Sequence, residues 1–338
     1  MAGETYARAG VDLQAAQKVK ETIKALASQT LGPQVVGGVG FFGGMYQLQG
    51  YHQPVLVSST DSVGTKVKIA NLMGRFDTVG VDLVNHCVND AFTCGARPLF
   101  FLDYIAMGHL VPDKAVALVK GVAQACQATG CYLIGGETAQ LPGVYPGEEF
   151  DLVGFVVGAV ERDSVLDGSS ISEGDALLGI ASNGLHTNGY SLARRVFGLE
   201  EAPSALDRTY PELGRTLGEA LLEPHRCYYP TLEPVLPLIR GMAHITGGGL
   251  PENVPRVLPQ GLGARFNTSA WESLPIFDLI QRAGRVDRDE MFRVFNMGLG
   301  MVLACAPENV EEVRRLVPEA RVVGEVVRAS GDERVVLK

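Results

Sequence analysis

The sequence lacks the features that mark secreted, membrane or nucleic-acid-binding proteins. No apolar run approaches the ~18 residues of a membrane span, and the opening Met-Ala-Gly-Glu has no basic segment followed by an apolar one, so no secretory signal is expected. A net charge of −9 argues against binding to nucleic acid or to an anionic membrane surface. The six cysteines form no Cys-x-x-Cys pair, so we expect reduced, mostly buried thiols in a cytoplasmic protein.

Glycine is the residue present in excess. The chain has 41 glycines in 338 residues, about 12% against a usual ~7%, and they cluster in polar loops beside expected strands. Apolar residues make up 46% and charged residues 20%, as in a globular protein with real cores. The length suggests about two domains.

Helices and strands alternate in both halves, which predicts an α/β or α+β fold with a mixed sheet covered by helices in each domain. Helices are expected at 12–26, 77–95, 112–129, 275–283 and 307–316, and strands at 55–59, 99–105, 131–134, 151–160, 176–181, 263–266, 298–304, 320–327 and 334–337. The four prolines of residues 223–238 predict a rigid connection rather than a helix. A linker at 167–170 sets the predicted domains at 1–167 and 168–338.

The segment Ser59-Thr60-Asp61-Ser62-Val63-Gly64-Thr65-Lys66 follows an apolar strand pattern. Its carboxylate suits Mg²⁺, Gly64 allows close backbone approach, and Thr65 and Lys66 could contact phosphate oxygens. It is not a Walker A loop, because the earlier glycine is missing. Alone, such a turn is more often a surface loop than a nucleotide site.

On the expected helix from Asp77, Asp82, His86 and Asp90 share one face at i, i+4 and i+8. A polar stripe usually faces solvent, but adjacent Asn89 and Asp90 are poor helix formers in mid-helix, which indicates a use. Asp82 and Asp90 lie about 12 Å apart along the helix, too far for one ion. We therefore predict that Asp61 and Asp90 bind Mg²⁺ and that Asn89 contacts the nucleotide.

Leu133-Ile134-Gly135-Gly136-Glu137-Thr138-Ala139 reads as a strand that ends in two glycines, an acid and a hydroxyl. The alternative is a plain turn. Three first-half strands, however, end near an acid, namely Asp61, Asp103 and Glu137, and converging acids at strand ends build metal–nucleotide sites. Glu137 is thus a candidate metal ligand, Gly135, Gly136 and Thr138 are candidate nucleotide contacts, and Asp103 is a candidate catalytic acid.

Residues 37–44, Gly-Gly-Val-Gly-Phe-Phe-Gly-Gly, cannot form a dinucleotide fingerprint, since no strand is expected to lead into them and no suitable helix leaves them. A flexible linker is one interpretation. Phe41 and Phe42 favour another, a lid whose backbone N–H groups, including those at Gly40, Gly43 and Gly44, close over phosphates.

The polar loop after the strand at 176–181 contains the residues Ser182, Asn183, His186, Thr187 and Asn188. His186 could be a structural loop residue, but an acid–base or substrate-phosphate role is at least as consistent with so short and polar a loop. We predict the whole set as substrate contacts.

Thr246, Gly247 and Gly248 precede an expected helix, whose N-terminus could bind an anion. Four further histidines do not have the spacing of a zinc site and are interpreted as structural: His52, His109, His225 and His244.

Taken in order, these motifs resemble the phosphoribosylformylglycinamidine cyclo-ligase (aminoimidazole ribonucleotide synthetase) family over essentially the whole chain. They comprise residues 6–12, 37–44, 61–66, 88–90, 95–99, 135–143, 182–191 and 245–249. Gly-Gly-Glu-Thr-Ala and His-Thr-Asn-Gly-Tyr-Ser are the specific segments. One departure is Ser62, where the family commonly has glycine.

The resemblance implies a two-domain ATP-binding fold that forms a homodimer through its first domain. It implies use of ATP and Mg²⁺ to close the imidazole ring of formylglycinamidine ribonucleotide, with Lys66 neutralising phosphate charge and His186 as the base. Lys24 aligns with a family lysine near ATP. Thiamine-phosphate kinases and selenophosphate synthetases share the Asp61 segment and remain rivals, as does a non-catalytic nucleotide-binding module.

Overall fold

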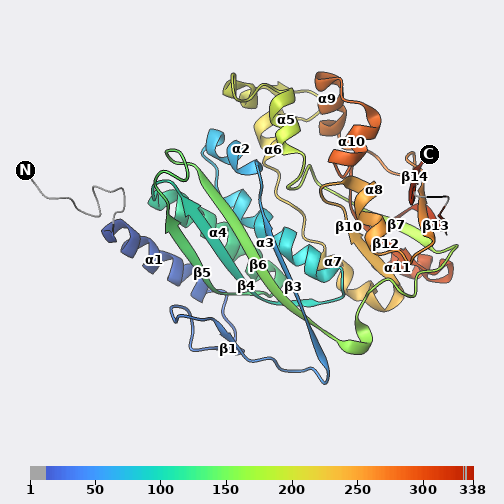
Figure 1. Ribbon diagram of the computed structural model, residues 1–338, viewed down its shortest axis with the longest axis horizontal. Coiled ribbons are helices and arrows are strands. Elements are labelled where there is room, and N and C mark those ends of the chain that lie inside the picture. Colours follow the sequence, from blue (N-terminus) through green and yellow to red (C-terminus); the bar gives the residue numbers. More distant parts are fainter. Residues whose placement is uncertain (1–12, 330, 332) are drawn as a thin grey trace, which may run out of the picture. The chain divides into compact units, whose positions relative to one another are not determined.

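The computed structural model describes residues 13–329, 331 and 333–338, so the expected cap at Asp12 and residues 6–12 lie outside it. The chain divides into two compact units (Figure 1). The first runs to Ala91 and continues over Arg97–Glu161; the second comprises Phe92–Ala96 and Arg162–Lys338. Two units were expected, and the structure divides them after Glu161 rather than after Asp167.

The first unit is built on a four-stranded sheet with the order β3-β6-β4-β5. Its strands are β3 (Pro54–Ser62), β6 (Phe150–Glu161), β4 (Arg97–Met107) and β5 (Tyr132–Gln140). β6 is antiparallel to both of its neighbours, whereas β4 and β5 are parallel. The sheet is therefore mixed, as predicted.

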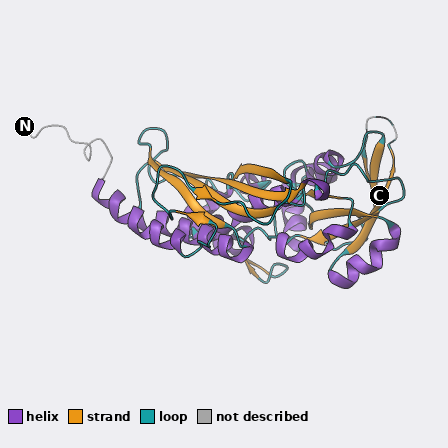
Figure 2. Cartoon of the chain, turned by 90° about the horizontal axis from the view of Figure 1, so that it is seen from below, coloured by secondary structure: helices purple, strands orange, loops and turns teal. Residues whose placement is uncertain are grey.

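Three long helices, α1 (Leu13–Ser28), α3 (Asp77–Phe92) and α4 (Pro112–Thr129), lie along one face of this sheet (Figure 2). Where α3 crosses α4 the backbones touch: a Cβ atom on Gly80 would lie 2.2 Å from Leu118 O, and one on Gly121 would lie 2.0 Å from Asp77 O. Only glycine permits this approach. The crossing sets the height of α3, which carries His86 and Asp90, above the sheet.

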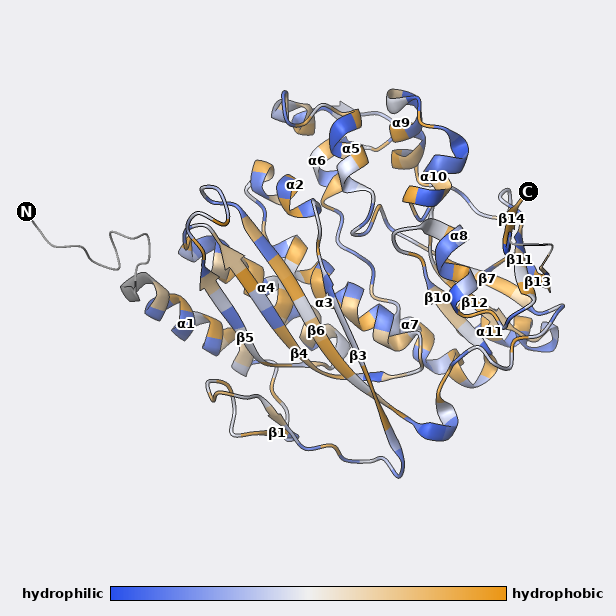
Figure 3. Ribbon diagram, in the orientation of Figure 1, coloured by the Kyte–Doolittle hydropathy of each residue, from blue (hydrophilic) through white to orange (hydrophobic). Residues whose placement is uncertain are grey.

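The opposite face of the sheet exposes large apolar side chains. Leu56 on β3 is 62% exposed, Phe155 on β6 is 38% exposed and Tyr104 on β4 is 37% exposed. The ladder registers place all three on the same side. Figure 3 shows how strongly apolar residues concentrate along β4 and β6. One face of the sheet is thus covered by helices, whereas the other exposes apolar side chains of the kind found at protein–protein interfaces.

The glycine-rich residues 37–44 form the loop of a small antiparallel hairpin, β1 (Val35–Val36) and β2 (Met45–Tyr46). The expectation that no strand leads into this segment was wrong. Because a strand rather than a helix follows, the segment is still not a dinucleotide fingerprint.

The second unit contains a six-stranded mixed sheet with the order β10-β12-β7-β13-β11-β14. Its strands are β7 (Ala176–Ala181), β10 (Gly241–His244), β11 (Leu262–Phe266), β12 (Leu299–Cys305), β13 (Arg321–Arg328) and β14 (Val335–Leu337). A separate pair is β8 (Thr209–Tyr210) and β9 (Arg215–Thr216). The helices are α5 (Tyr190–Val196), α6 (Leu217–Leu221), α7 (Tyr229–Leu232), α8 (Gly249–Asn253), α9 (Pro275–Gly284), α10 (Arg288–Val294) and α11 (Val310–Leu316).

Several local expectations differ from the structure. The proline-rich residues 223–238 include the one-turn helix α7 and a 3-10 helix, Glu233–Leu238, because proline is tolerated in the first turn of each. Residues 66–73 form helix α2 (Lys66–Met73), which the sequence reading missed. The single tryptophan, Trp271, lies in the second unit, where its Nε1 donates to Met297 O at 2.9 Å.

All six cysteines are free thiols, and four of them are buried, as expected. Within the described part of the chain, no helix combines the length and the apolar character needed to cross a bilayer.

Candidate functional site

Asp61 and Asp90 meet at one histidine of the first unit. Asp61 Oδ2 lies 3.1 Å from His86 Nε2, and Asp90 Oδ2 lies 3.7 Å from the same nitrogen. The Asp61 and Asp90 side chains are 39% and 31% exposed, whereas that of His86 is 6% exposed. The structure thus brings the two predicted metal ligands together, with an imidazole between them that the prediction did not include.

Asp61 itself lies within β3 and not in a loop after it, because the ladder with β6 continues to Ser62. Its Oδ1 accepts from the Ser62 N–H at 2.7 Å, which fixes the carboxylate orientation. Gly64 and Thr65 follow as exposed residues, and Thr65 is the N-cap of α2. The buried Asn89 lies on α3 beside Asp90.

Lys66 is placed differently from the prediction. Its ammonium is fully buried and lies 2.8 Å from both carboxylate oxygens of Asp82, which is also fully buried. A buried charge must be paired, and this pair ties the start of α2 to α3. The arrangement does not offer the Lys66 ammonium to a phosphate at the surface, so the expected direct contact is corrected to an internal ion pair.

The three acids expected at strand ends do not converge. Asp61 and Asp103 are both register partners of Gly154, so they share a face but are two strands apart, about 10 Å at the strand spacing. Glu137 pairs with Tyr104 and therefore points to the opposite face from Asp103. All three lie inside strands, so Glu137 does not lie beside Asp61 and Asp90 within one chain, and its role as a metal ligand stays a prediction.

A pocket of about 560 Å³ in the first unit gathers most of the predicted nucleotide contacts. It is lined by Lys20, Ile23, Lys24, Ala27, residues 39–44, Leu102, Asp103, Leu133 and residues 135–138. Lys24 Nζ approaches the glycine backbone closely, since a Cβ atom on Gly40 would lie 3.3 Å from it. Two lysines from α1, a glycine-rich loop and the Gly-Gly-Glu-Thr strand therefore surround one cavity, as an anionic ligand requires.

Asp103 is the buried acid of this pocket. Burial raises the pKa of its carboxyl to about 7, partly offset by its own backbone N–H. A Cβ atom on Gly136 would lie 2.0 Å from Asp103 Oδ1, so the glycine is needed to seat the carboxyl. A carboxyl that is half protonated near neutral pH can give or take a proton.

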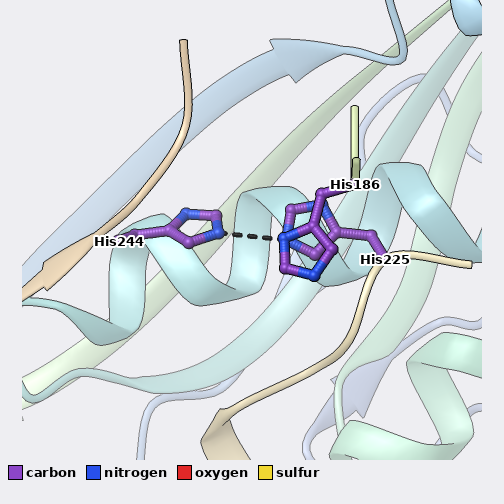
Figure 4. A group of neighbouring side chains, drawn as sticks. All are labelled: His186, His225 and His244. Atoms are coloured by element: carbon purple, nitrogen blue, oxygen red, sulfur yellow. Dashed lines mark hydrogen bonds between the residues drawn. The ribbon is translucent and has the colours of Figure 1, made fainter. Parts of the chain in front are cut away.

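The second unit assembles three buried histidines (Figure 4). The rings of His186 and His225 are stacked with centroids 3.9 Å apart, and His225 Nε2 lies 3.0 Å from His244 Nε2. One ring nitrogen of each of the three histidines lies within 4.8 Å of those of the other two. The ring planes of His186 and His225 lie face to face at 18°, whereas imidazoles that share a metal ion direct their edges toward it, so the cluster is better suited to stacking and hydrogen bonding than to zinc.

Two members of this cluster, His225 and His244, were interpreted from sequence as isolated structural histidines. They come from a segment without regular structure and from the end of β10, and no local spacing pattern connects them to His186. Only their meeting in the fold reveals the cluster.

The polar loop before α5 is held by buried amides. Ser182 Oγ donates to Asn296 Oδ1 at 2.9 Å, and Asn296 Nδ2 donates to Gly184 O at 2.9 Å. The hydroxyl of Ser182 is therefore engaged inside the protein. Asn188 lies against Gly247, whose added Cβ would be 3.0 Å from Asn188 Oδ1.

Thr246 and Gly247 belong to a loop organised by Asn253, which donates to Gly247 O at 3.1 Å and to Gly249 O at 2.9 Å. The following helix α8 has only five residues, and the Glu252 carboxylate lies beside Gly248. A short helix and a nearby negative charge both weaken anion binding. The predicted anion-binding N-terminus at Gly248 is therefore not supported, while the loop does lie beside Asn188. Thr187 is buried next to His186.

Comparisons with known proteins identify relatives of both units. The family model described as "AIR synthase related protein, N-terminal domain" matches residues 44–160, and the model described as its C-terminal domain matches residues 172–337. Proteins named phosphoribosylformylglycinamidine cyclo-ligase are similar over nearly the whole chain. That of Geobacillus kaustophilus is 50% identical, with 97% of each chain covered, and that of Myxococcus xanthus is 50% identical, with 99% covered.

Solved structures with lower identity share the fold. Thiamine-monophosphate kinase from Stenotrophomonas maltophilia K279a matches with a TM-score of 0.68 at 15% identity over 97% of this chain and 96% of that one. Escherichia coli HypE matches with a TM-score of 0.65 at 18% identity over 94% and 93%. These identities show a common architecture alone, whereas the family descriptions span both units. The chain belongs to the AIR synthase related family.

Proposed function

We propose that this protein is an enzyme that uses ATP to close the imidazole ring of formylglycinamidine ribonucleotide, giving 5-aminoimidazole ribonucleotide, ADP and phosphate in purine biosynthesis. The observation that carries the proposal is the 50% identity to cyclo-ligases over essentially the full length of both chains. Thiamine-monophosphate kinase, one of the rivals, matches at 15% identity, which supports a common fold without a common substrate.

The pocket between α1, the β1–β2 loop and β5 is the proposed ATP site. Lys20 and Lys24 supply positive charge, and the backbone N–H groups of residues 39–44 supply donors. A protein with the same fold, HypE, has been solved in complex with ATP. The exposed Phe41 and Phe42 would gain burial when the loop closes.

Asp61 and Asp90 fit Mg²⁺, because Mg²⁺ takes one or two carboxylates together with phosphate oxygens and both side chains are partly exposed. When bound, the ion would neutralise charge on the transferring phosphoryl group. His86 lies between the two carboxylates, and the Lys66–Asp82 pair ties α2, which follows Asp61 in the chain, to α3, which bears Asp90.

The proposed reaction has two stages. The γ-phosphoryl group of ATP passes to the formamide oxygen, and ADP leaves. The ribosyl-bearing amidine nitrogen then attacks the activated carbon, the C–O bond to phosphate breaks, and a proton leaves the nitrogen. In the proposal His186 takes that proton, and the loops around Asn188 and Gly247 hold the substrate.

The second copy of the chain is the proposed partner, docked on the open face of the first-unit sheet. Leu56, Tyr104 and Phe155 are exposed on one face of the sheet rather than scattered singly over the surface, as is typical of a protein–protein interface. An identical face on a second molecule would cover it in an isologous contact.

The activity is tested by following ADP and phosphate release from the full-length protein with ATP, Mg²⁺ and formylglycinamidine ribonucleotide. We expect release that depends on the ribonucleotide, unchanged in His52→Ala, which alters an exposed loop, and greatly reduced in Asp90→Asn. Release of ADP without free phosphate in the presence of thiamine monophosphate, and none with the ribonucleotide, would instead identify a kinase.

A further inference from the structure

His186 is held in its loop by its backbone conformation and by several side-chain contacts. Its backbone has φ +63°, in the left-handed region, and Tyr190 Oη lies 3.1 Å from its carbonyl oxygen and 2.7 Å from that of Leu221. Its ring Nε2 lies 3.1 Å from Asn183 Oδ1. A side chain so held has a defined ring orientation, and the neighbouring groups then decide which nitrogen carries the proton.

The orientation of the Asn183 amide follows from its other contacts. Asn183 Nδ2 lies 2.7 Å from Pro224 O and 3.5 Å from Glu223 Oε1, both of which only accept hydrogen bonds. The NH₂ group must face them, because a flipped amide would place Oδ1 against two oxygens. Glu223 is itself held by an ion pair with Arg215.

The amide oxygen that faces His186 can only accept. His186 Nε2 must therefore donate, so in the neutral ring the hydrogen is on Nε2 and the lone pair is on Nδ1. The assignment follows from hydrogen-bond chemistry alone and needs no assumption about substrate.

His225 fixes the plane of the ring. It stacks on His186 with an interplanar angle of 18° and is anchored by its contact with His244 Nε2 at 3.0 Å, in which one nitrogen donates and the other accepts. On another side, a Cβ atom on Gly300 would lie 2.7 Å from His186 Cε1, so β12 packs directly against the ring edge. Tyr228 also lies against His186, with its hydroxyl donating to Ala181 O at 3.0 Å.

We propose that Asn183 and His225 are positioning residues that hold His186 as the Nε2–H tautomer, with Nδ1 as the nitrogen that takes the proton during ring closure. The inference rests on the proposed function of His186 as a base. It reassigns Asn183, expected from sequence to contact substrate, to a role that acts through His186.

The tautomer is measured directly in the unmodified full-length protein labelled with ¹⁵N-histidine, by long-range ¹H–¹⁵N correlation spectra, with His186→Ala used to assign the signal. We expect the Nε2–H pattern for His186. The Nδ1–H pattern would overturn the proposal.

Turnover separates positioning from a purely structural role. Asn183→Leu keeps the size of the side chain but removes the acceptor, and we expect kcat to fall about 10- to 100-fold, by analogy with the loss when the hydrogen-bond partner of a metal-bound histidine is removed, with KM for ATP within about twofold. His225→Phe, which keeps a stacking ring, should retain most of kcat, whereas His225→Ala should not. Equal kcat in the two His225 variants, or normal kcat in Asn183→Leu, would overturn the positioning role.

Failure of the proposed function has a different signature. Normal turnover of His186→Ala per folded molecule would show that His186 is not the base of the reaction. The tautomer spectrum of the unmodified protein tests the positioning itself, whatever the turnover.

Discussion

Asp103 shows how a single buried carboxyl can make stability depend on pH. Desolvation raises its pKa from 3.8 to about 7, so the folded protein binds a proton that the unfolded chain has already released between these values. Stability from this residue is therefore highest below about pH 4 and falls as pH rises to about 7.

We expect Asp103→Asn to remove most of this pH dependence. At pH 8 the first unit of the variant should be more stable, by up to about 4 kcal/mol for a shift of about three pKa units, and at pH 4 the two proteins should match. Urea unfolding at both pH values measures the difference. The exposed Asp163→Asn is the matched control, and an Asp103→Asn protein with the same pH slope as the unmodified protein would contradict the account.

Residue identities predicted which residues line the first-unit pocket better than they predicted the ion pairs. Lys24, Gly40 and Thr138 do line one pocket, because loops and strand ends with glycine carry a local signal. Lys66 was misplaced because its partner Asp82 comes from the next helix, and sequence alone gives no measure of burial. The contact of His86 with Asp61 was missed for the same reason, because the two residues come from different elements.

At the scale of elements, long periodic segments were predicted well and short ones were not. The helix Pro112–Thr129 has the expected bounds, whereas β1, β2 and α2 were missed because two to eight residues carry too little periodicity. The strand lengths around Asp61 and Glu137 were underestimated, since ladder partners on β6 and β4 extend them.

The β1–β2 loop is expected to change its dynamics with ligand. Its glycines remove steric restriction, and Phe42 is fully exposed in this state, so closure over ATP would bury apolar surface. Amide hydrogen exchange of residues 37–44 should slow when ATP and Mg²⁺ are added. The turn between β8 and β9, at residues 211–214, should exchange alike in both states. Equally fast exchange of residues 37–44 with and without ATP would make the segment a linker.

At the scale of the whole molecule, the open face of the first-unit sheet predicts self-association. Phe155→Asp would place a carboxylate without a partner in the middle of the proposed interface, which should weaken dimerisation at least 100-fold, or about 2.7 kcal/mol. Sedimentation equilibrium measures this directly. Leu316→Asp, which alters an exposed apolar residue of the second unit, should leave the assembly unchanged. A monomer at all concentrations in the unmodified protein would remove the proposal.

The position of Trp271 has a consequence for optical measurements. As the sole tryptophan, it packs edge-on against Phe266 and donates to Met297 O, so its emission reports the packing of the second unit. The first unit contributes only tyrosines and phenylalanines to the spectrum. Two units with separate cores need not unfold together. Fluorescence selectively excited at tryptophan would then follow one transition while circular dichroism follows both, and a gap between the two curves would resolve the stabilities of the units without cutting the chain.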